Sequence, residues 1–370
     1  MKTLLFVIGT RPEGIKVAPV IMEAMKHPDK YKCYVCNTGQ HKEMLQQVID
    51  YFDIPVHYDL AIMHSNQTLF SITINSLKKM EDVLEEAKPD VVLVQGDTTT
   101  AFVATLAAYY KKIKVAHIEA GLRTNNKYAP FPEEVNRSLI GCIADIHFAP
   151  TVQAADNLKK ENISEHVYIT GNTVIDALLH TKEKEKNSSI QENKFSFLDK
   201  TKKNILVTGH RRENLGKPFE DICHAIKTLA DMHEDIEFTY PVHLNPQVME
   251  PVKRILGNHP RIHLIDPLDY PSLVWLMNRS YIILTDSGGI QEEAPALGKP
   301  VLVMRETTER PEGVEAGSAK LVGTNQHLII NSINELLNNT TLYNQMANTV
   351  NPYGTGNSAV QIIEKLNTIF

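Results

Sequence analysis

The chain has 370 residues and a mass of 41.6 kDa. This exceeds the roughly 250–300 residues at which one hydrophobic core stops growing, so we expect two domains. Hydrophobic residues make up 42% and charged residues 22% of the chain, which excludes disordered, collagen-like and coiled-coil proteins. The net charge of −6 disfavours binding of a polyanion such as nucleic acid, so a phosphate ligand needs a local site.

Features of secreted and membrane proteins are weak in this sequence. Four cysteines are too few for a disulfide framework. The apolar run before Gly9 is shorter than the roughly 7–15 residues of a secretory leader core, and a buried first strand explains it better. No stretch approaches the roughly 18–20 apolar residues of a membrane span. We therefore expect a cytoplasmic protein without a membrane partner.

Short apolar runs alternate with helical patterns in the first half of the chain, which is typical of parallel βαβ units. Residues 14–25 predict a helix with a bend at Pro19. The predicted strands are Thr3–Gly9, Lys32–Asn37, Val91–Gln95, Lys114–Glu119, His147–Ala149 and His166–Ile169.

From His180 to Asn204 the chain carries charges without a sustained apolar period, which predicts a connection between domains. The final segment, Ser358–Phe370, begins with a capping residue and carries one apolar stripe, so it should dock on a core. A second α/β series lies between these segments. Its predicted strands are Asn204–Thr208, Glu237–Pro241, Ile262–Ile265, Tyr281–Thr285, Val301–Met304 and Lys320–Val322.

The two halves repeat one pattern of strand, acidic residue, small polar loop, helix and strand. Asp97 is the acid in the first half and Asp286 in the second. Ligands of open α/β sheets bind outside the carboxyl ends of the strands. Two such halves facing each other would therefore place both loops across one cleft.

Two loops have the composition of phosphate sites. Asp286-Ser-Gly-Gly follows a strand and begins a helix, so its glycines and free N–H groups could receive a phosphate. The alternative is a tight turn with a helix cap, and the loop matches neither the P-loop nor the dinucleotide motif. Gly9-Thr-Arg-Pro-Glu-Gly also follows a strand, and Arg11 with Lys16 would bring positive charge. The alternative is a helix start that only faces solvent. It is less favourable, because the positive charges of Arg11 and Lys16 near a helix N-terminus oppose the helix dipole.

A histidine and several carboxylates follow other strands. His210 stands beside Arg211 at a predicted strand end, and taken singly it is either a structural residue, a phosphate donor or an acid/base. Together with Asp97, Glu119 and Glu133 it predicts an acid/base set. A metal site is the less favoured interpretation, because no zinc or calcium motif is present.

The pair Cys33 and Cys36 has the spacing of a redox motif. It lies within a predicted strand, where positions three apart point to opposite faces. Core packing is the favoured role.

These motifs, in this order, resemble those of the non-hydrolysing bacterial UDP-N-acetylglucosamine 2-epimerases. The resemblance covers nearly the whole chain. The matching segments are Gly-Thr-Arg-Pro-Glu, Val-Gln-Gly-Asp-Thr, His-Ile-Glu-Ala-Gly-Leu-Arg-Thr, Phe-Pro-Glu-Glu-Val-Asn-Arg, Gly-His-Arg-Arg-Glu-Asn, Thr-Asp-Ser-Gly-Gly-Ile-Gln-Glu-Glu-Ala, Arg-Glu-Thr-Thr-Glu-Arg-Pro-Glu and Asn-Pro-Tyr-Gly-Thr-Gly.

The resemblance implies a glycosyltransferase-B-like fold, with two Rossmann-like domains facing across a cleft and a last helix crossing back to the first domain. The expected domains are residues 1–171 with 356–370, and residues 172–355. Family members interconvert UDP-GlcNAc and UDP-ManNAc for cell-envelope polysaccharides, without metal or nicotinamide, and are usually homodimers. We therefore expect no cofactor.

The resemblance also implies a role for individual residues. Those matching acid/base and sugar-contacting positions are Asp97, Glu119, Glu133 and His210. Those matching other nucleotide-sugar contacts are Arg11 and Lys16 near the diphosphate, Ser287, Gly288 and Gly289 at the phosphates, Glu293 at the ribose, Leu268 and Leu273 at the uracil, and the further ligand-binding Arg310.

Many family members carry a second, activating UDP-GlcNAc site. Position 66 of that pattern prefers arginine, but this chain has Asn66, which cannot offer a charged fork of donors to a diphosphate. We predict weakened or absent activation. The matching residues are Gln40, His41, Gln67, Glu133, Arg211 and His243.

Three alternatives stay open. A hydrolysing epimerase would release free ManNAc and UDP, but this chain has no fused sugar-kinase segment. A glycosyltransferase shares the fold but need not place so many carboxylates near C2. A nucleotide-sugar sensor would bind without turnover, which retention of all four acid/base candidates disfavours.

Overall fold

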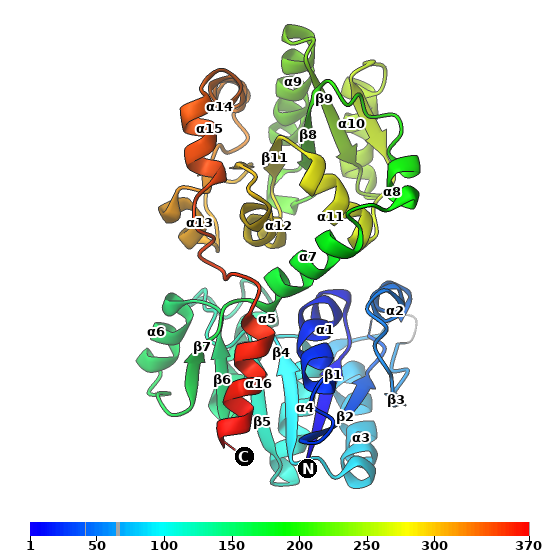
Figure 1. The fold of residues 1–370 in the computed structure, drawn as a ribbon, viewed down its shortest axis with the longest axis vertical. Helices are drawn as coiled ribbons and strands as arrows, with labels where there is room; N and C mark the ends of the chain where they lie inside the picture. The colour runs from blue at the N-terminus through cyan, green and yellow to red at the C-terminus, as the bar shows by residue number, and fades with distance from the viewer. Residues whose placement is uncertain (41, 64–66, 370) are drawn as a thin grey trace. The chain divides into compact units, whose positions relative to one another are not determined.

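The computed structural model describes residues 1–40, 42–63 and 67–369 (Figure 1). The chain divides into two compact units. The first comprises Met1–Ala177 and Tyr353–Phe370, and the second comprises Leu178–Pro352. Each unit is built around its own parallel sheet covered by helices, which is the Rossmann-like α/β architecture expected from the sequence.

The sheet of the first unit has the strand order β3-β2-β1-β4-β5-β6-β7, and neighbouring strands in this order are parallel. Its central strands are continuous apolar runs, because helices bury both of their faces. In β1, for example, all residues from Leu4 to Ile8 are buried. The strands are β1 (Lys2–Ile8), β2 (Tyr31–Asn37), β3 (Tyr58–Asp59), β4 (Val91–Gln95), β5 (Lys114–Ile118), β6 (Ile146–Ala149) and β7 (Val167–Ile169).

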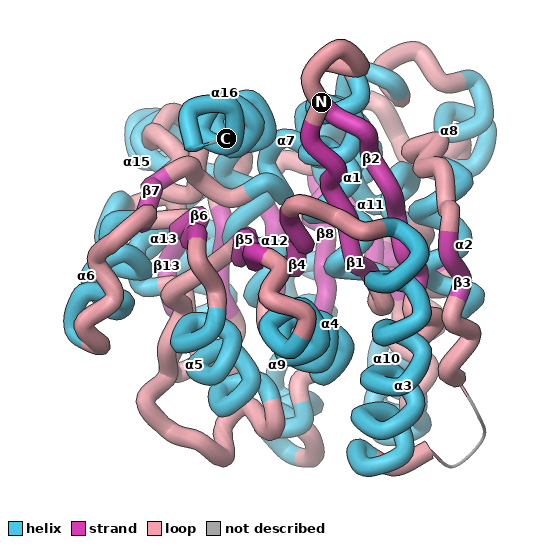
Figure 2. Tube along the Cα trace, turned by 90° about the horizontal axis from the view of Figure 1, so that it is seen from below, coloured by secondary structure: helices cyan, strands magenta, loops and turns pink. Residues whose placement is uncertain are grey.

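Helices cover both faces of this sheet. Figure 2 shows α1 and α16 on one face and α3, α4 and α5 on the other. The helices are α1 (Arg11–Met25), α2 (Lys42–Tyr51), α3 (Leu69–Ala87), α4 (Thr99–Tyr110), α5 (Glu133–Ile143), α6 (Val152–Lys160), α7 (Thr173–Lys184) and α16 (Ser358–Ile369).

The C-terminal helix α16 belongs to the first unit, as predicted. Tyr31 Oη donates to Asn367 Oδ1 at 2.7 Å, and the N–H of Ala359 donates to Asp176 Oδ1 at 2.9 Å. The apolar stripe of α16 is buried, and its Leu366 is fully inaccessible. The last segment of the chain therefore completes the core of the unit in which the chain begins.

The sheet of the second unit has the order β10-β9-β8-β11-β12-β13, again parallel. One face packs against α9, α10 and α14 in a continuous apolar core. The strands are β8 (Lys203–Thr208), β9 (Ile236–Pro241), β10 (Ile262–Ile265), β11 (Ile282–Thr285), β12 (Val301–Val303) and β13 (Ala319–Leu321). The helices are α8 (Ser189–Lys194), α9 (Lys217–Met232), α10 (Pro246–Leu256), α11 (Tyr270–Arg279), α12 (Gly288–Glu293), α13 (Pro311–Ala316), α14 (Gln326–Asn338) and α15 (Thr340–Ala347), with 3₁₀ turns at Arg212–Asn214 and Ala294–Leu297.

The structure corrects the sequence interpretation at three places. Residues 180–204 are not a connector but complete α7, form α8 and enter β8 within the second unit, while the unit boundary falls inside α7. Helix α1 begins at Arg11 rather than Gly14, because Thr10 caps it and Glu13 completes a capping box. Strand β3 was not predicted, because it pairs only two residues at the sheet edge. The division into two domains predicted from the sequence, with boundaries at residues 171/172 and 355/356, stays a prediction.

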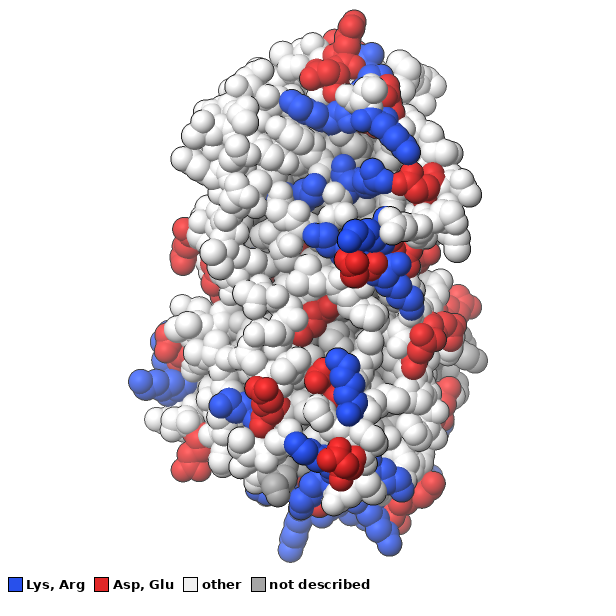
Figure 3. Space-filling view, viewed as in Figure 1, with Lys and Arg blue, Asp and Glu red and all other residues white. Residues whose placement is uncertain are grey.

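Two surface properties bear on possible partners. Among the helices of the described ranges, none combines the length and apolarity needed to cross a bilayer. On the face drawn in Figure 3, acidic and basic side chains are interspersed. That distribution agrees with the small net charge of −6.

Candidate active site

The strand order of the first unit brings three predicted functional loops to one edge of its sheet. Strands β1, β4 and β5 are neighbours, and their carboxyl ends lead to Gly9, Gly96 and Glu119. Parallel strands end at the same edge, so these loops are adjacent. Arg11, Lys16, Asp97 and Glu119 are all carried by these loops or by the helices that follow them.

Lys16 and Glu119 form an ion pair at this edge. Their side chains are only 15% and 8% exposed. Glu119 directly follows β5 and has a φ angle of 65°, which is uncommon for a residue other than glycine. Such strain persists only where the surroundings over-determine it, and it often occurs at functional sites. The paired Lys16 therefore helps to hold the Glu119 carboxylate in a fixed position.

Asp97 is held by residues of α5. Its carboxylate pairs with the Arg137 guanidinium, and its backbone carbonyl accepts a hydrogen bond from Asn136 Nδ2 at 2.9 Å. Glu134 accepts a further bond from Arg137 at 3.1 Å. Sequence reasoning did not single out Arg137, although it lies in the Phe-Pro-Glu-Glu-Val-Asn-Arg segment, three residues after Glu134. The spacing i, i+3 on a helix was the signal that could have found it.

His117 fixes the turn that precedes Asp97. Its Nε2–H donates to the carbonyl of Gly96 at 2.7 Å, because a carbonyl can only accept. Burial lowers the pKa of His117 to about 3, so the ring stays neutral. Gly96 has a φ of 70°, which glycine adopts readily. The buried histidine is therefore a structural support for the Asp97 loop.

Glu13 joins two of the functional loops. One carboxylate oxygen accepts from the N–H groups of Gly9 and Thr10 at 3.0 and 2.7 Å, and the other accepts from Thr98 Oγ1 at 2.6 Å. Burial raises the pKa of Glu13 to about 7, against the lowering effect of these hydrogen bonds. This link between α1 and the residue after Asp97 was missed, since the sequence analysis gave Glu13 no role of its own.

The remaining predicted residues of the first unit lie near these loops. Arg11 is the first residue of α1 and is half-buried. Glu133 begins α5, and its Oε2 is buried without a hydrogen-bond partner in the described part of the chain. A carboxylate at a helix N-terminus is favoured by the helix dipole.

In the second unit, neighbouring strands β8 and β11 carry the other two predicted loops. Asp286 follows β11 and is fully buried. Its Oδ2 accepts from the backbone N–H groups of His210 and Arg211, both at 2.8 Å. The loop after β8 is thus fastened to the start of the Ser-Gly-Gly turn.

The Ser-Gly-Gly turn leads directly into α12. Ser287 is the residue before the helix, but its side chain makes no capping hydrogen bond. A Cβ built on Gly288 would lie 3.8 Å from Arg211 Nη2, so the guanidinium lies close to the turn. An accessible hydroxyl, backbone N–H groups and a nearby guanidinium are the donors that bind phosphates in proteins.

Glu293, Leu268 and Leu273 lie around the adjoining ends of α11 and α12. Glu293 is buried and accepts from Tyr270 Oη at 3.0 Å, which ties α12 to the first turn of α11. Leu268 and Leu273 flank that turn and are half-buried. Arg310 pairs with Glu292 of α12. The predicted nucleotide-binding residues of this unit therefore cluster on neighbouring elements.

The residues expected for a second UDP-GlcNAc site are divided between the units. Gln40 accepts from Thr100 Oγ1 at 3.3 Å in the first unit, which also carries Gln67. In the second unit, the rings of His210 and His243 are stacked at 5.1 Å with an interplanar angle of 9°. His41 and Asn66 lie outside the described residues.

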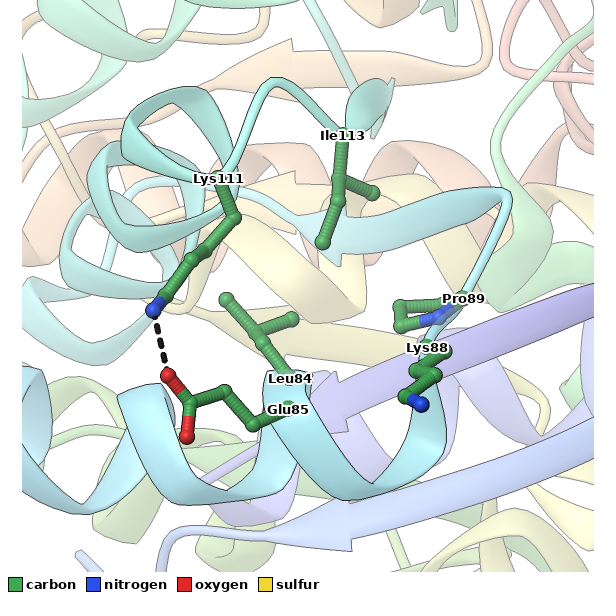
Figure 4. Close-up of a pocket in the computed structure, with 6 residues that line it drawn as sticks. All are labelled: Leu84, Glu85, Lys88, Pro89, Lys111 and Ile113. Carbon is green, nitrogen blue, oxygen red and sulfur yellow. Dashed lines mark hydrogen bonds and ion pairs between the residues drawn. The ribbon is translucent and has the colours of Figure 1, made fainter.

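Two surface hollows of the described residues lie away from these loops. One, of about 550 Å³, is lined by Leu84, Glu85, Lys88, Pro89, Lys111 and Ile113 near the amino ends of β4 and β5 (Figure 4). The other, of about 410 Å³, includes Asn204 and Glu237 at the amino ends of β8 and β9. Ligands of open α/β sheets bind at the opposite, carboxyl edge, so neither hollow is the candidate site. Among the described side chains, no group of three or more His, Cys, Asp and Glu is arranged to hold a metal ion.

Comparisons with known proteins give matches that cover nearly the whole chain. The family model described as UDP-N-acetylglucosamine 2-epimerase matches residues 23–367. Proteins named UDP-N-acetylglucosamine 2-epimerase are 51% identical in Escherichia coli K12 (98% of each chain) and 53% identical in Campylobacter jejuni (99% of this chain, 97% of that one).

A solved structure gives the same result. The crystal structure of UDP-GlcNAc 2-epimerase from Neisseria meningitidis bound to UDP-GlcNAc superposes with a TM-score of 0.91 at 51% identity, covering 99% of this chain and 100% of that one. The match extends over both units and includes the C-terminal helix. The chain belongs to the UDP-N-acetylglucosamine 2-epimerase family.

Proposed function

We propose that this protein reversibly converts UDP-GlcNAc into UDP-ManNAc by inverting C2 of the sugar, and so supplies a precursor for envelope polysaccharides. The observation that carries the proposal is the 51% identity to the E. coli protein named UDP-N-acetylglucosamine 2-epimerase, over 98% of both chains. The carboxylates and phosphate-type donors at the strand ends supply the groups that such a reaction requires.

The chemistry explains why both kinds of group are needed. The C2 proton is adjacent to no carbonyl group, so direct abstraction would be very slow. Elimination avoids this difficulty: the C1–O bond breaks with its electrons leaving on UDP, positive charge develops at C1 and makes the C2 proton acidic, and a base takes that proton as C1=C2 forms. The addition then returns UDP to C1 while an acid delivers a proton to the other face of C2.

The second unit is suited to receive the leaving diphosphate. Ser287 with the N–H groups of Gly288 and Gly289 would bind the phosphates, and His210 would donate to the developing negative charge. Arg310 would bind the ligand beside them. Glu293 and the half-buried Leu268 and Leu273 would take the ribose and the uracil.

The first unit is suited to move the protons. Asp97, Glu119 and Glu133 are the proposed acid and base groups, and at least one of them must be protonated when it acts as an acid. Arg137 and Lys16 already neutralise two of these carboxylates and hold them in place. Arg11 and Lys16 would also attract the diphosphate.

We further propose a cytoplasmic homodimer that binds UDP-GlcNAc and UDP-ManNAc but no nucleic acid. None of the four cysteines is paired in a disulfide, which fits a reducing compartment. Phe70 and Ile74, one turn apart on α3, are 81% and 63% exposed, and apolar side chains of this size are typical of protein interfaces. Light scattering on the purified protein tests the dimer.

The decisive experiment incubates the purified protein with UDP-GlcNAc in D₂O without any added cofactor, and follows the sugar by NMR. We expect both UDP-hexosamines, with deuterium at C2. Free ManNAc and UDP as products would favour the hydrolysing reaction. Binding without any product would indicate a sensor, and transfer of the sugar without C2 labelling would indicate a glycosyltransferase.

A further inference from the structure

Asp286 is a buried acid whose two carboxylate oxygens have different surroundings. Oδ2 accepts from the N–H groups of His210 and Arg211 and lies 3.4 Å from Asn214 Nδ2. This oxygen is fully occupied in fixing the loop after β8. The other oxygen, Oδ1, is buried and has no hydrogen-bond partner within the described part of the chain.

The ring nitrogen near this orphan oxygen belongs to His210. His210 Nδ1 lies 3.8 Å from Asp286 Oδ1, which is longer than a hydrogen bond. The imidazole is 47% exposed and can turn towards the carboxylate, whereas Asp286 is fixed by its backbone partners. Leaving a buried carboxylate oxygen unpaired is unfavourable, so closure of this gap is favoured. Hydrogen bonds between catalytic groups are often long before a ligand binds.

Within the described ranges of the chain, neither ring nitrogen of His210 is engaged in a hydrogen bond. The His243 ring is stacked on the face of the His210 ring, and its own Nδ1 accepts from the N–H of Asn245 at 3.1 Å. Arg211 is the adjacent residue of the loop. Burial, His243 and Arg211 all lower the pKa of His210, and the Asp286 carboxylate opposes them by favouring the protonated ring.

We propose that Asp286 is a positioning residue that fixes the tautomer of His210, accepting a hydrogen bond from Nδ1–H and directing Nε2 away from the protein towards the ligand. A carboxylate can only accept, so the ring must carry a proton on Nδ1 to satisfy it. Nε2 is then the atom that takes up a proton and donates it as a hydrogen bond to an anion. The catalytic consequence rests on the proposed function of His210.

The tautomer can be observed directly by ¹⁵N NMR of the histidine side chains in the whole protein. The His210 signal is assigned by its disappearance in His210→Asn. In the wild type, we expect neutral His210 to carry its proton on Nδ1. Neutral His210 with its proton on Nε2 would overturn the proposal, and this measurement needs no variant of Asp286.

Asp286→Asn gives the second test. The amide oxygen can still accept from the two backbone N–H groups, while the amide N–H₂ now faces His210 Nδ1 as a donor. We expect His210 to change to the Nε2–H tautomer and its measured imidazole pKa to fall. Asp231→Asn is the matched control, because Asp231 lies 3.1 Å from Nε2 of the distant His259 in the same unit and should leave His210 unchanged.

Kinetics then separate positioning from folding. We expect Asp286→Asn to lower kcat by about 10²-fold or more with little change in KM, as for a misoriented acid/base group. An unchanged His210 tautomer and pKa in folded Asp286→Asn would overturn the proposal. If the wild-type protein fails to interconvert the two UDP-sugars, the proposed function is overturned. The tautomer measurement does not depend on turnover, so it tests the role of Asp286 independently of that result.

Discussion

Lys16 and Glu119 form an ion pair between α1 and the residue after β5, although they lie 103 positions apart in the sequence. The pair is largely buried, and Glu119 has a left-handed backbone conformation. Removing one partner of such a pair leaves the other charge uncompensated. The position of the Glu119 carboxylate therefore depends on Lys16, a residue that is itself predicted to bind the diphosphate.

Glu119→Gln should lower turnover by about 10²-fold or more, the usual scale for a lost acid/base group. The amide keeps the size of the side chain but can no longer exchange a proton. The rate of UDP-ManNAc formation measures the effect. Glu81→Gln is the matched control, because Glu81 pairs with Lys111 on the surface of the same unit and should leave turnover nearly unchanged. Equal rates for the two variants would remove Glu119 from the mechanism.

Asp97→Asn should likewise lower turnover by about 10²-fold or more. The bond from Asn136 to the Asp97 backbone carbonyl is unaffected, so the loop should keep its conformation. Asp90→Asn serves as the control, since Asp90 precedes β4 at the opposite edge of the sheet and binds Thr3 N–H. Near-normal kcat in Asp97→Asn would contradict the assignment.

Glu13→Gln should change how stability depends on pH. The pKa of Glu13 is raised from 4.5 to about 7, so the folded state binds more protons than the unfolded state between these values. The contribution of Glu13 is therefore fully present below about pH 4.5 and is lost as pH rises through about 7. It amounts to about 3 kcal/mol, since one pKa unit corresponds to about 1.4 kcal/mol.

Chemical denaturation of both proteins from pH 4.5 to 8 tests this prediction. The free energy of unfolding of the wild type should fall relative to Glu13→Gln as the pH rises. A constant difference between the two proteins across this range would mean that Glu13 is ionised throughout.

Ser287→Ala should weaken UDP binding by about 0.5–1.5 kcal/mol, the contribution of one neutral hydrogen bond. The side chain makes no capping bond, so the helix itself should not be destabilised. Calorimetry with UDP measures the change. Ser196→Ala, at an exposed serine of the same unit, is the control. Identical affinities in all three proteins would exclude a phosphate contact at Ser287.

Activation by UDP-GlcNAc should be weak or absent. By the resemblance drawn from the sequence, Asn66 stands where activated family members are expected to have arginine, and an amide cannot form a charged pair with a diphosphate. Initial rates from UDP-ManNAc, with and without a trace of UDP-GlcNAc, measure the effect. A large increase in rate would refute the prediction, and Asn66→Arg should increase activation if the missing charge is the cause.

The local sequence was sufficient to predict the positions of most of the strands. Val91–Gln95 and Ile262–Ile265 were predicted with the bounds that the structure gives. Buried parallel strands are short apolar runs bounded by turn residues, so the pattern is visible without tertiary information. The segment at 180–204 was misinterpreted because its helices are short and largely polar, and packing within the second unit stabilises them.

The sequence by itself determined the α/β class, the strand ends that carry the polar loops and the family to which the motifs belong, because these properties are encoded in short contiguous segments. Only the tertiary structure decided that Arg137 holds Asp97, that Glu13 joins two loops and that Asp286 faces His210. These contacts depend on strand order and side-chain direction, which bring distant residues together and leave no local periodicity in the chain.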